Sequence, residues 1–465
     1  MKLPIFLTLS LQAAVPLFAS IDVIPRIIKE IRTNGKAYAD LKELTSIGSR
    51  LSGSQGAEKA VAWGKNKMES YGFDKVWLEE LKAPKWERGK NEGAVLKLPS
   101  GDLRLKLAAL GNSVATPEEG IEAEVLEVKN LKEVETLGKK LSGKIVFYNQ
   151  PMDTSLPSTF EAYGKVISQR TKGAAKASPF GAVGVVIRSL TTLPDDDHPH
   201  TGVMSYGEAP KIPAGALSSH GANLLSAALK VTPDLKLRMT LSSRSLPDVP
   251  SYNVIGEIQG SKLPLEYVLI GGHLDSWDLG PGAHDDGAGV VQSIEVLRAV
   301  KTLGLRPTRS LRAVLFMSEE FGGYGGQQYA ERVKTARDRP IAAMESDRGG
   351  SSPRGFSLDG SKAFLSKITS WKKYLALVGA SEIVSEGGGT DVEPLKRYGI
   401  PVMDLLTDGR HYFDLHHSAL DTVDKVSPTE LHEGAAALAT LAYLIAEEGT
   451  QNTQTVALSS RQKYR

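Results

Sequence analysis

Two histidines and four aspartates lie close together between residues 271 and 289, in the stretch GGHLDSWDLGPGAHDDGAG. Imidazole nitrogens and carboxylate oxygens are the ligands that divalent cations take in proteins when no thiolate is offered. The chain contains no Cys, which excludes thiolate metal sites, cysteine nucleophiles and disulfides. The pattern therefore predicts a metal site that includes His273 and Asp285 and takes its other ligands from distant segments.

Further acidic residues and histidines follow the predicted strands in the second half of the chain. From residue 251 apolar strands alternate with helices, which predicts an α/β fold with a mostly parallel sheet and helices on both faces. Ligands of such sheets bind beyond the carboxyl ends of the strands. The candidates at those positions are His273 after YVLIGG, Asp285 before the next helix, Glu319 and Glu320 after LRAVLFMS, Asp347 after PIAAMES and His417 in the loop after PVMDLL. We expect these side chains to meet at one edge of the sheet.

Two histidines and several carboxylates suit a pair of divalent ions that share one bridging carboxylate. Paired ions of this kind hold a water molecule and a substrate carbonyl together. Glu319 and Glu320 are adjacent, so one can ligate an ion while the other acts as general base on the water. The pattern indicates hydrolytic chemistry.

The rest of the chain indicates a multidomain exported protein. Its 465 residues predict two to three domains. Residues 1–20, MKLPIFLTLSLQAAVPLFAS, are typical of a signal peptide, so we expect a secreted or periplasmic protein with no membrane anchor after cleavage. Residues 119–245 contain several short apolar strands and are predicted to form an inserted domain, which leaves 21–118 and 246–465 for the catalytic domain. The net charge of +2, without a basic tract, gives no indication of nucleic-acid binding.

The motifs HLD, HDDGAG, SEEFGG, ESD and HHS, in this order, resemble those of the co-catalytic zinc exopeptidase family, of the aminopeptidase and glutamate carboxypeptidase type. The segment IGSRLSGSQGAEKAVAWGKNKMESYGF is similar to the N-terminal part of that family, and residues 119–245 resemble its protease-associated domain. The resemblance covers nearly the whole chain after the signal peptide. It implies a zinc exopeptidase fold with an inserted α+β domain, two zinc ions per chain, small peptide or dipeptide substrates and a possible homodimer.

The resemblance also implies how the ions are held. His273 and Asp347 would bind different ions of the pair, and Asp285 would bridge them. Glu320 and His417 would complete the two ligand sets. The neighbours Asp286 and His416 are set aside by motif position alone, and His416 could instead contact the substrate or support a ligand.

Two further residues receive roles from the resemblance. Glu319 would be the general base that helps a metal-bound water attack the carbonyl and passes the proton to the leaving amine. Asp275, two residues after His273, would orient that imidazole.

Several other polar residues are interpreted as structural rather than catalytic. Asp278 and His284 are interpreted as loop residues, His198 and His200 as parts of an exposed loop, and Arg348 and Arg354 as surface charges that could alternatively hold a substrate carboxylate. The segment GGGTDVEP, residues 387–394, either lines the pocket or caps a helix through Thr390 or Asp391.

Two other functions are possible on the same scaffold. A glutaminyl cyclase-like acyl transferase would use a single zinc ion, so the metal stoichiometry would separate it from a peptidase. A receptor-like non-enzyme would have lost ligands, whereas every ligand and the base are present here. Whether the peptidase is an aminopeptidase, a dipeptidase or a carboxypeptidase stays open.

Overall fold

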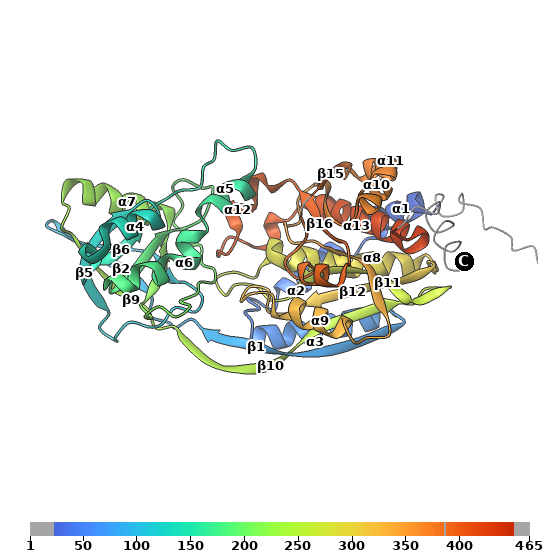
Figure 1. Ribbon diagram of the computed structural model, residues 1–465, viewed down its shortest axis with the longest axis horizontal. Coiled ribbons are helices and arrows are strands. Elements are labelled where there is room, and N and C mark those ends of the chain that lie inside the picture. Colours follow the sequence, from blue (N-terminus) through green and yellow to red (C-terminus); the bar gives the residue numbers. More distant parts are fainter. Residues whose placement is uncertain (1–22, 386, 451–465) are drawn as a thin grey trace, which may run out of the picture.

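The computed structural model describes residues 23–385 and 387–450, which form two lobes, each built on an eight-stranded sheet (Figure 1). The first lobe comprises residues 23–87 and 244–450, and the second lobe comprises residues 88–243. The predicted signal peptide lies outside the described residues. Among the helices of the described ranges, none is both long and apolar enough to cross a bilayer.

The sheet of the first lobe has a parallel centre and antiparallel additions at both sides. In spatial order its strands are β1 Lys75–Glu87, β10 Arg244–Ile258, β12 Arg309–Phe316, β11 Leu263–His273, β13 Arg339–Glu345, β16 Val402–Thr407, β14 Pro353–Asp359 and β15 Glu382–Ser385. Strands β12, β11, β13 and β16 are parallel to one another. Strands β1 and β10 pair antiparallel, and β14 pairs antiparallel with β16. The predicted α/β fold with helices on both faces is confirmed, although only the centre of the sheet is parallel.

Successive residues of the central strands enter two different apolar cores. In β11, Val268 and Ile270 belong to one core, whereas Tyr267 and Leu269 belong to the other. The 3-10 segment Glu393–Tyr398 and α9 Tyr324–Val333 cover the second face. The first face is covered by α1 Ile24–Asn34, α2 Ala37–Thr45, α3 Gln55–Ser70, α8 Ala288–Thr302, α10 Lys362–Ser370 and α13 Pro428–Glu448. Burial on both faces explains why these strands are continuous apolar runs.

Local signals fix the ends of the main helices. Ser54 accepts a hydrogen bond from the main-chain N–H of Ala57 at the start of α3, and Ser427 does the same for Glu430 at the start of α13. The segment 366–379 has the apolar spacing of a single helix, but the helix breaks at Trp371 into α10 and α11 Lys372–Leu375. The apolar spacing continues across this break, so the pattern did not reveal it.

The second lobe contains the predicted short strands and three strands that precede them. In spatial order its sheet is β3 Gly101–Leu105, β2 Gly93–Leu98, β9 Lys236–Thr240, β5 Ile121–Val128, β6 Ile145–Tyr148, β7 Gly184–Arg188, β8 Ala214–Leu217 and β4 Leu107–Ala109. Its helices are α4 Leu131–Leu137, α5 Thr159–Val166, α6 Ser168–Ala177 and α7 Ser219–Val231. The predicted start of the inserted domain at residue 119 is wrong, because the hairpin β2–β3 pairs with β9 and places the start of this sheet at Gly93. That the lobe is a protease-associated domain stays a prediction.

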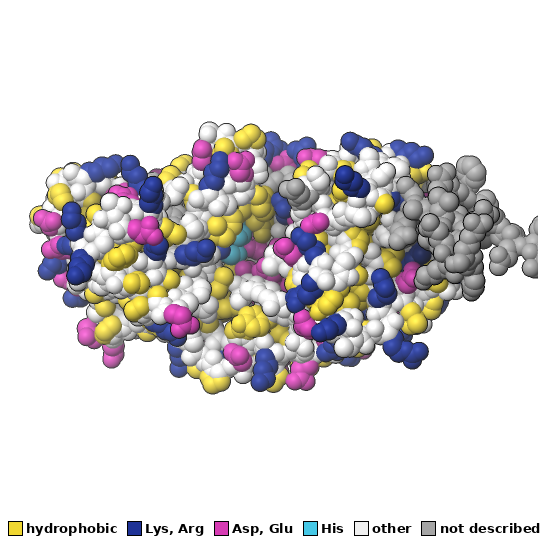
Figure 2. Space-filling view, viewed as in Figure 1, with side chains coloured by type: hydrophobic (Ala, Val, Ile, Leu, Met, Phe, Trp, Pro, Cys, Tyr) yellow, Lys and Arg dark blue, Asp and Glu magenta, His cyan; other side chains and the backbone are white. Residues whose placement is uncertain are grey.

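The two lobes are connected by a long pair of strands and face each other across a cleft. β1 and β10 pair antiparallel from Lys75↔Glu257 to Glu87↔Arg244, and the pair extends between the two lobes (Figure 1). Figure 2 shows the surface hollowed between the lobes, with histidine and acidic side chains at the bottom of the hollow. The carboxyl ends of the parallel strands open toward this cleft.

Candidate metal centre

The structure brings the five predicted ligands together at the carboxyl edge of the sheet. They are His273 at the end of β11, Asp285 in the turn Ala283–Gly287 before α8, Glu320 in the turn after β12, Asp347 two residues after β13, and His417 just after α12 Tyr412–Leu415. Four of them are buried, and the side chain of Asp347 is 20% exposed. The expected meeting of these side chains is confirmed, whereas their role as ligands stays a prediction.

One group of donors forms around His273. The Nε2 atom of His273 lies 3.1 Å from Asp285 Oδ1 and 3.4 Å from Asp347 Oδ1. These three residues can point one atom each at a single ion. These side chains lie close together because β11 and β13 are neighbouring parallel strands, so their carboxyl ends lie side by side. That His273 and Asp347 bind different ions stays a prediction.

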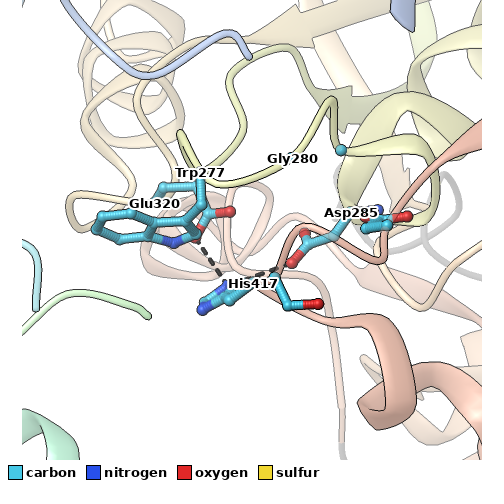
Figure 3. Close-up of a pocket in the computed structure, with 8 residues that line it drawn as sticks. Trp277, Gly280, Asp285, Glu320 and His417 are labelled. Carbon is cyan, nitrogen blue, oxygen red and sulfur yellow. Dashed lines mark hydrogen bonds and ion pairs between the residues drawn. The ribbon is translucent and has the colours of Figure 1, made fainter. Parts of the chain in front are cut away.

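A second group of donors forms around His417 (Figure 3). The Nε2 atom of His417 lies 3.2 Å from Asp285 Oδ2 and 3.1 Å from Glu320 Oε2. His416, whose role was left open, places its Nε2 atom 3.8 Å from Asp285 Oδ2 and stacks on the His417 ring with centroids 3.5 Å apart. Asp285 directs one oxygen to each group, which is the arrangement of a bridging carboxylate.

The chemistry of this donor set fits divalent cations. Asp285 Oδ2 and Glu320 Oε1 are buried and accept no hydrogen bond of good geometry from any described residue. Burial raises the pKa of Glu320, and the charge of Asp285 raises it further. Carboxylates crowded together without compensating cations are costly, and coordination of metal ions removes this cost.

Asp286 makes structural contacts rather than contributing to the donor groups. Its Oδ2 accepts a hydrogen bond from the main-chain N–H of His273 at 2.9 Å, and its Oδ1 accepts one from that of Gly289 at 3.0 Å. Both oxygens are therefore engaged by main chain, and this supports the choice of Asp285 as the ligand.

Asp275 holds the turn that carries the two glutamates. Its Oδ1 accepts hydrogen bonds from the main-chain N–H groups of Ser318 at 2.8 Å and Glu319 at 3.1 Å. Its Oδ2 accepts one from Glu320 at 3.4 Å. The Nδ1 atom of His273 is 3.1 Å from the main-chain oxygen of Asp275 and 3.7 Å from its carboxylate. Asp275 thus orients the imidazole mainly through its main chain, and its carboxylate positions the glutamates.

Glu319 has the environment of a general base. Burial raises the pKa of Glu319 well above its usual value, and the charges of Asp347 and Glu320 raise it further, against the opposing effect of His273. A carboxylate with a raised pKa is a better acceptor of a proton from water near neutral pH. The main chain turns sharply just before it, because Ser318 has φ 70°.

Three structural residues at this edge were not found from the sequence. Arg50 is fully buried and donates hydrogen bonds to the main-chain oxygens of Leu274, Pro281 and Gly282, which shapes the loop between His273 and Asp285. Asp421 accepts hydrogen bonds from the main-chain N–H groups of His284 at 2.7 Å and Asp285 at 3.0 Å. Trp277 donates its indole N–H to Glu320 Oε2 at 2.5 Å (Figure 3).

The structural interpretation of Asp278 and His284 is confirmed. Asp278 accepts two hydrogen bonds from the guanidinium of Arg88, at 2.8 and 3.0 Å. His284 accepts a hydrogen bond from the main-chain N–H of Gly350 through Nδ1 and donates one to the main-chain oxygen of Lys425 through Nε2. Neither side chain is available to a metal ion.

The interpretation of the histidines in DDDHPH is only partly correct. His198 is 42% exposed and pairs with Asp196. The prediction that His200 lies in an exposed loop is wrong, because its side chain is buried and its Nδ1 lies 2.6 Å from the main-chain oxygen of His416. His416 belongs to the other lobe, so this contact cannot be seen in the local sequence.

The arginines after Asp347 and the glycine-rich segment make structural contacts. Arg354 is exposed and pairs with Asp408 at 2.8 Å, as expected of a surface charge. Arg348 is instead partly buried, and its Nε atom is paired with Asp404. Asp391 accepts a hydrogen bond from the main-chain N–H of Gly326 in the first turn of α9, so it caps a helix other than the one it precedes.

Comparison with known proteins decides the family. The profile of Peptidase family M28 matches residues 253–442. Carboxypeptidase Q from Homo sapiens is 36% identical over 418 residues, which cover 90% of this chain and 86% of that protein. The chain belongs to peptidase family M28. Carboxypeptidase Q from Xenopus laevis is 36% identical over 432 residues, which cover 92% of the chain and 90% of the relative.

Solved structures agree with membership of family M28. A peptidase M28 precursor from Shewanella amazonensis has 34% identity and a TM-score of 0.88, over 93% of this chain and 98% of that one. A zinc aminopeptidase from Bacillus subtilis has the same fold, with 18% identity and a TM-score of 0.65 over 89% of this chain and 96% of that one. The expected resemblance to zinc exopeptidases of the aminopeptidase and glutamate carboxypeptidase type is confirmed, and this M28 protein is a metallopeptidase.

Proposed function

We propose that this M28 peptidase is a di-zinc exopeptidase that hydrolyses small peptides, including dipeptides. The observation that supports it best is the position of Asp285, whose two oxygens lie 3.1 Å from His273 Nε2 and 3.2 Å from His417 Nε2. A carboxylate between two imidazoles in a buried acidic pocket suits a pair of zinc ions that share one ligand.

Each ion would have its own ligands beside the shared aspartate. Asp285 would be shared by the two ions, His273 and Asp347 would bind different ions, and Glu320 and His417 would complete the two ligand sets, with His416 stacked on His417. The bound ions supply the Lewis acidity that activates water and polarises the scissile carbonyl.

The residues around the ions would perform the remaining steps. Glu319 accepts a proton from the attacking water and donates it to the nitrogen of the leaving amine. Asp275 keeps Glu319 and Glu320 in place through three main-chain hydrogen bonds. Trp277 holds Glu320 Oε2, which limits the orientations of that carboxylate.

The position of the site supports a peptide substrate that enters from the cleft. The pocket lined by Asp285, Glu320, His417 and five neighbouring residues has a volume of about 10 Å³, roughly the space of one water molecule. The substrate would therefore lie mainly in the cleft between the lobes (Figure 2). The N-terminal sequence supports export to the periplasm or the exterior, and the resemblance supports a homodimer.

The experiment is product analysis combined with metal counting. Purified protein is incubated with dipeptides, longer peptides, and N-acetylated and C-amidated versions, with and without chelator, beside Glu319→Gln. Release of amino acids that stops with chelator and with Glu319→Gln, from protein that holds two zinc ions per chain, would support the proposal. The blocked version that survives would identify the end that is recognised. No cleavage by zinc-loaded protein would refute the proposal, and cyclised N-terminal glutamine with one ion per chain would indicate the cyclase alternative.

A further inference from the structure

The second lobe binds the main chain of the segment that carries His416 and His417. The main-chain N–H of Thr201 donates to the carbonyl oxygen of His417 at 3.0 Å. The Nδ1 atom of His200 lies 2.6 Å from the carbonyl oxygen of His416, so His200 donates the Nδ1 proton there. Two consecutive carbonyl groups of the first lobe are thus held by two consecutive residues of the second.

The second lobe also contacts the outer nitrogen of the His417 ring. The Nδ1 atom lies 3.3 Å from the carbonyl oxygen of Thr201 and 3.3 Å from Nη1 of Arg170. If Nε2 of His417 binds a metal ion, Nδ1 carries the proton and donates it to Thr201, which fixes both the tautomer and the ring plane. A Cβ at Gly202 would lie 2.5 Å from Cζ of Arg170, so the guanidinium is packed directly on this glycine.

Aromatic side chains of α5 complete the contact. The ring of Tyr163 lies 4.6 Å from that of Phe413 and 5.2 Å from that of His416, between centroids. Phe160 lies 5.3 Å from Tyr412. These contacts belong to an apolar cluster that includes residues of both lobes. The segment that bears the two histidines is therefore packed against the second lobe on its side chains as well as on its main chain.

The other histidine, His273, is held by residues of the first lobe. Asp286 accepts the main-chain N–H of His273, and Asp421 accepts that of Asp285. The Nδ1 atom of His273 lies 3.1 Å from the main-chain oxygen of Asp275. Hence the two histidines of the site differ in what holds them.

We propose that His200, Thr201 and Tyr163 of the second lobe are positioning residues for His417, so that the affinity for one ion of the pair depends on the docking of the two lobes while the affinity for the other does not. This inference rests on the proposed two-ion function. Partners that orient a ligating histidine typically change metal affinity about 10–100-fold when they are removed.

The test is calorimetric titration of zinc into metal-free full-length protein, repeated with cobalt and its visible absorption. His200→Leu and Tyr163→Leu should each weaken one of the two ions about 10-fold or more and leave the other within about threefold. His200→Asn should restore the lost affinity, because its amide N–H can replace the Nδ1 donor. His198→Leu is the matched control in the same loop, with an exposed side chain, and should change neither ion.

Two results would overturn the inference. Equal weakening of both ions, or no change in His200→Leu and in Tyr163→Leu, would show that the second lobe does not act on one ion. Thermal unfolding of each metal-free variant reports whether it folds, and Tyr163→Leu carries the test if His200→Leu does not. One ion per wild-type chain would instead refute the proposed function on which the inference rests.

Discussion

Replacement of Asp275 by asparagine tests how the catalytic turn is held. The carboxylate is fully buried and accepts three main-chain hydrogen bonds, from Ser318, Glu319 and Glu320. In Asp275→Asn the amide oxygen can keep two of these donors, while the NH₂ group faces the third. A buried donor without an acceptor costs about 1–3 kcal/mol, and the two remaining bonds lose the strength that the negative charge gave them.

The weakened hydrogen bonds hold the main chain of the general base, Glu319, and of the proposed ligand Glu320, so the substitution should lower activity. We expect kcat/KM for a dipeptide to fall about 10–100-fold, which corresponds to about 1.4–2.7 kcal/mol. The assay is steady-state hydrolysis at saturating zinc, with the unfolding temperature of each variant measured in parallel. Asp278→Asn is the matched control. Asp278 lies in the same loop as Asp275 but is paired with Arg88 and does not contact the glutamates.

The reasoning would be refuted if Asp275→Asn kept kcat/KM within about twofold of the wild type. It would also be refuted if Asp278→Asn, at an equal loss of stability, lost as much activity as Asp275→Asn. Either result would mean that the main-chain hydrogen bonds of the turn do not position Glu319.

Three further predictions concern the base, the core and the pH dependence of stability. Glu319→Gln should lower kcat about 100–10,000-fold with zinc content unchanged by elemental analysis, and an active variant with full zinc content would contradict its role as base. Gly289→Ala should lower the free energy of unfolding, measured with denaturant, by about 1–3 kcal/mol or more, because the added Cβ would lie 1.8 Å from the main-chain oxygen of Ser346. The control Gly164→Ala should be neutral or stabilising, because no atom lies within 4 Å of the added Cβ. Burial lowers the pKa of His432 below 6.5, so the folded protein becomes less stable as the pH falls below that value and the unfolded chain takes up the proton. Between about pH 8 and about pH 5 the unfolding temperature of His432→Asn should therefore fall less than that of the wild type. An equal fall would show that His432 does not contribute to the pH dependence.

The edge of the sheet at which the ligands meet could be predicted, because the strands are apolar runs and each candidate follows one of them. The grouping of the ligands could not, since chain order does not give spatial order. β11 precedes β12 in the chain but lies between β12 and β13 in the sheet, which places His273 beside Asp347. The role of Arg50 in shaping the loop could not be predicted for a different reason. Its guanidinium binds main-chain carbonyl oxygens, which every residue possesses, so no pattern of side chains indicates these contacts.

The second lobe was predicted in its centre and mistaken at its beginning. The segment from Gly93 to Leu105 forms an antiparallel hairpin, but its partner β9 lies far along the chain. Likewise, the sequence around His200 is typical of a polar loop, but the side chain is buried and contacts His416 of the other lobe. Contacts between distant segments decided both cases.

The pairing of Glu87 with Arg244 puts the entry and the exit of the second lobe side by side on antiparallel strands. A short turn could therefore close β1 onto β10 and remove residues 88–243 without cutting the first sheet. Such a shortened chain would be a topologically complete α/β protein that still carries Glu319 and all five proposed ligands. By the contacts of His200 and Thr201, it would nevertheless lack what fixes His417. If the second lobe fixes His417 as proposed, an insertion that is dispensable for the path of the chain takes part in its chemistry, and this lobe cannot be exchanged freely for another.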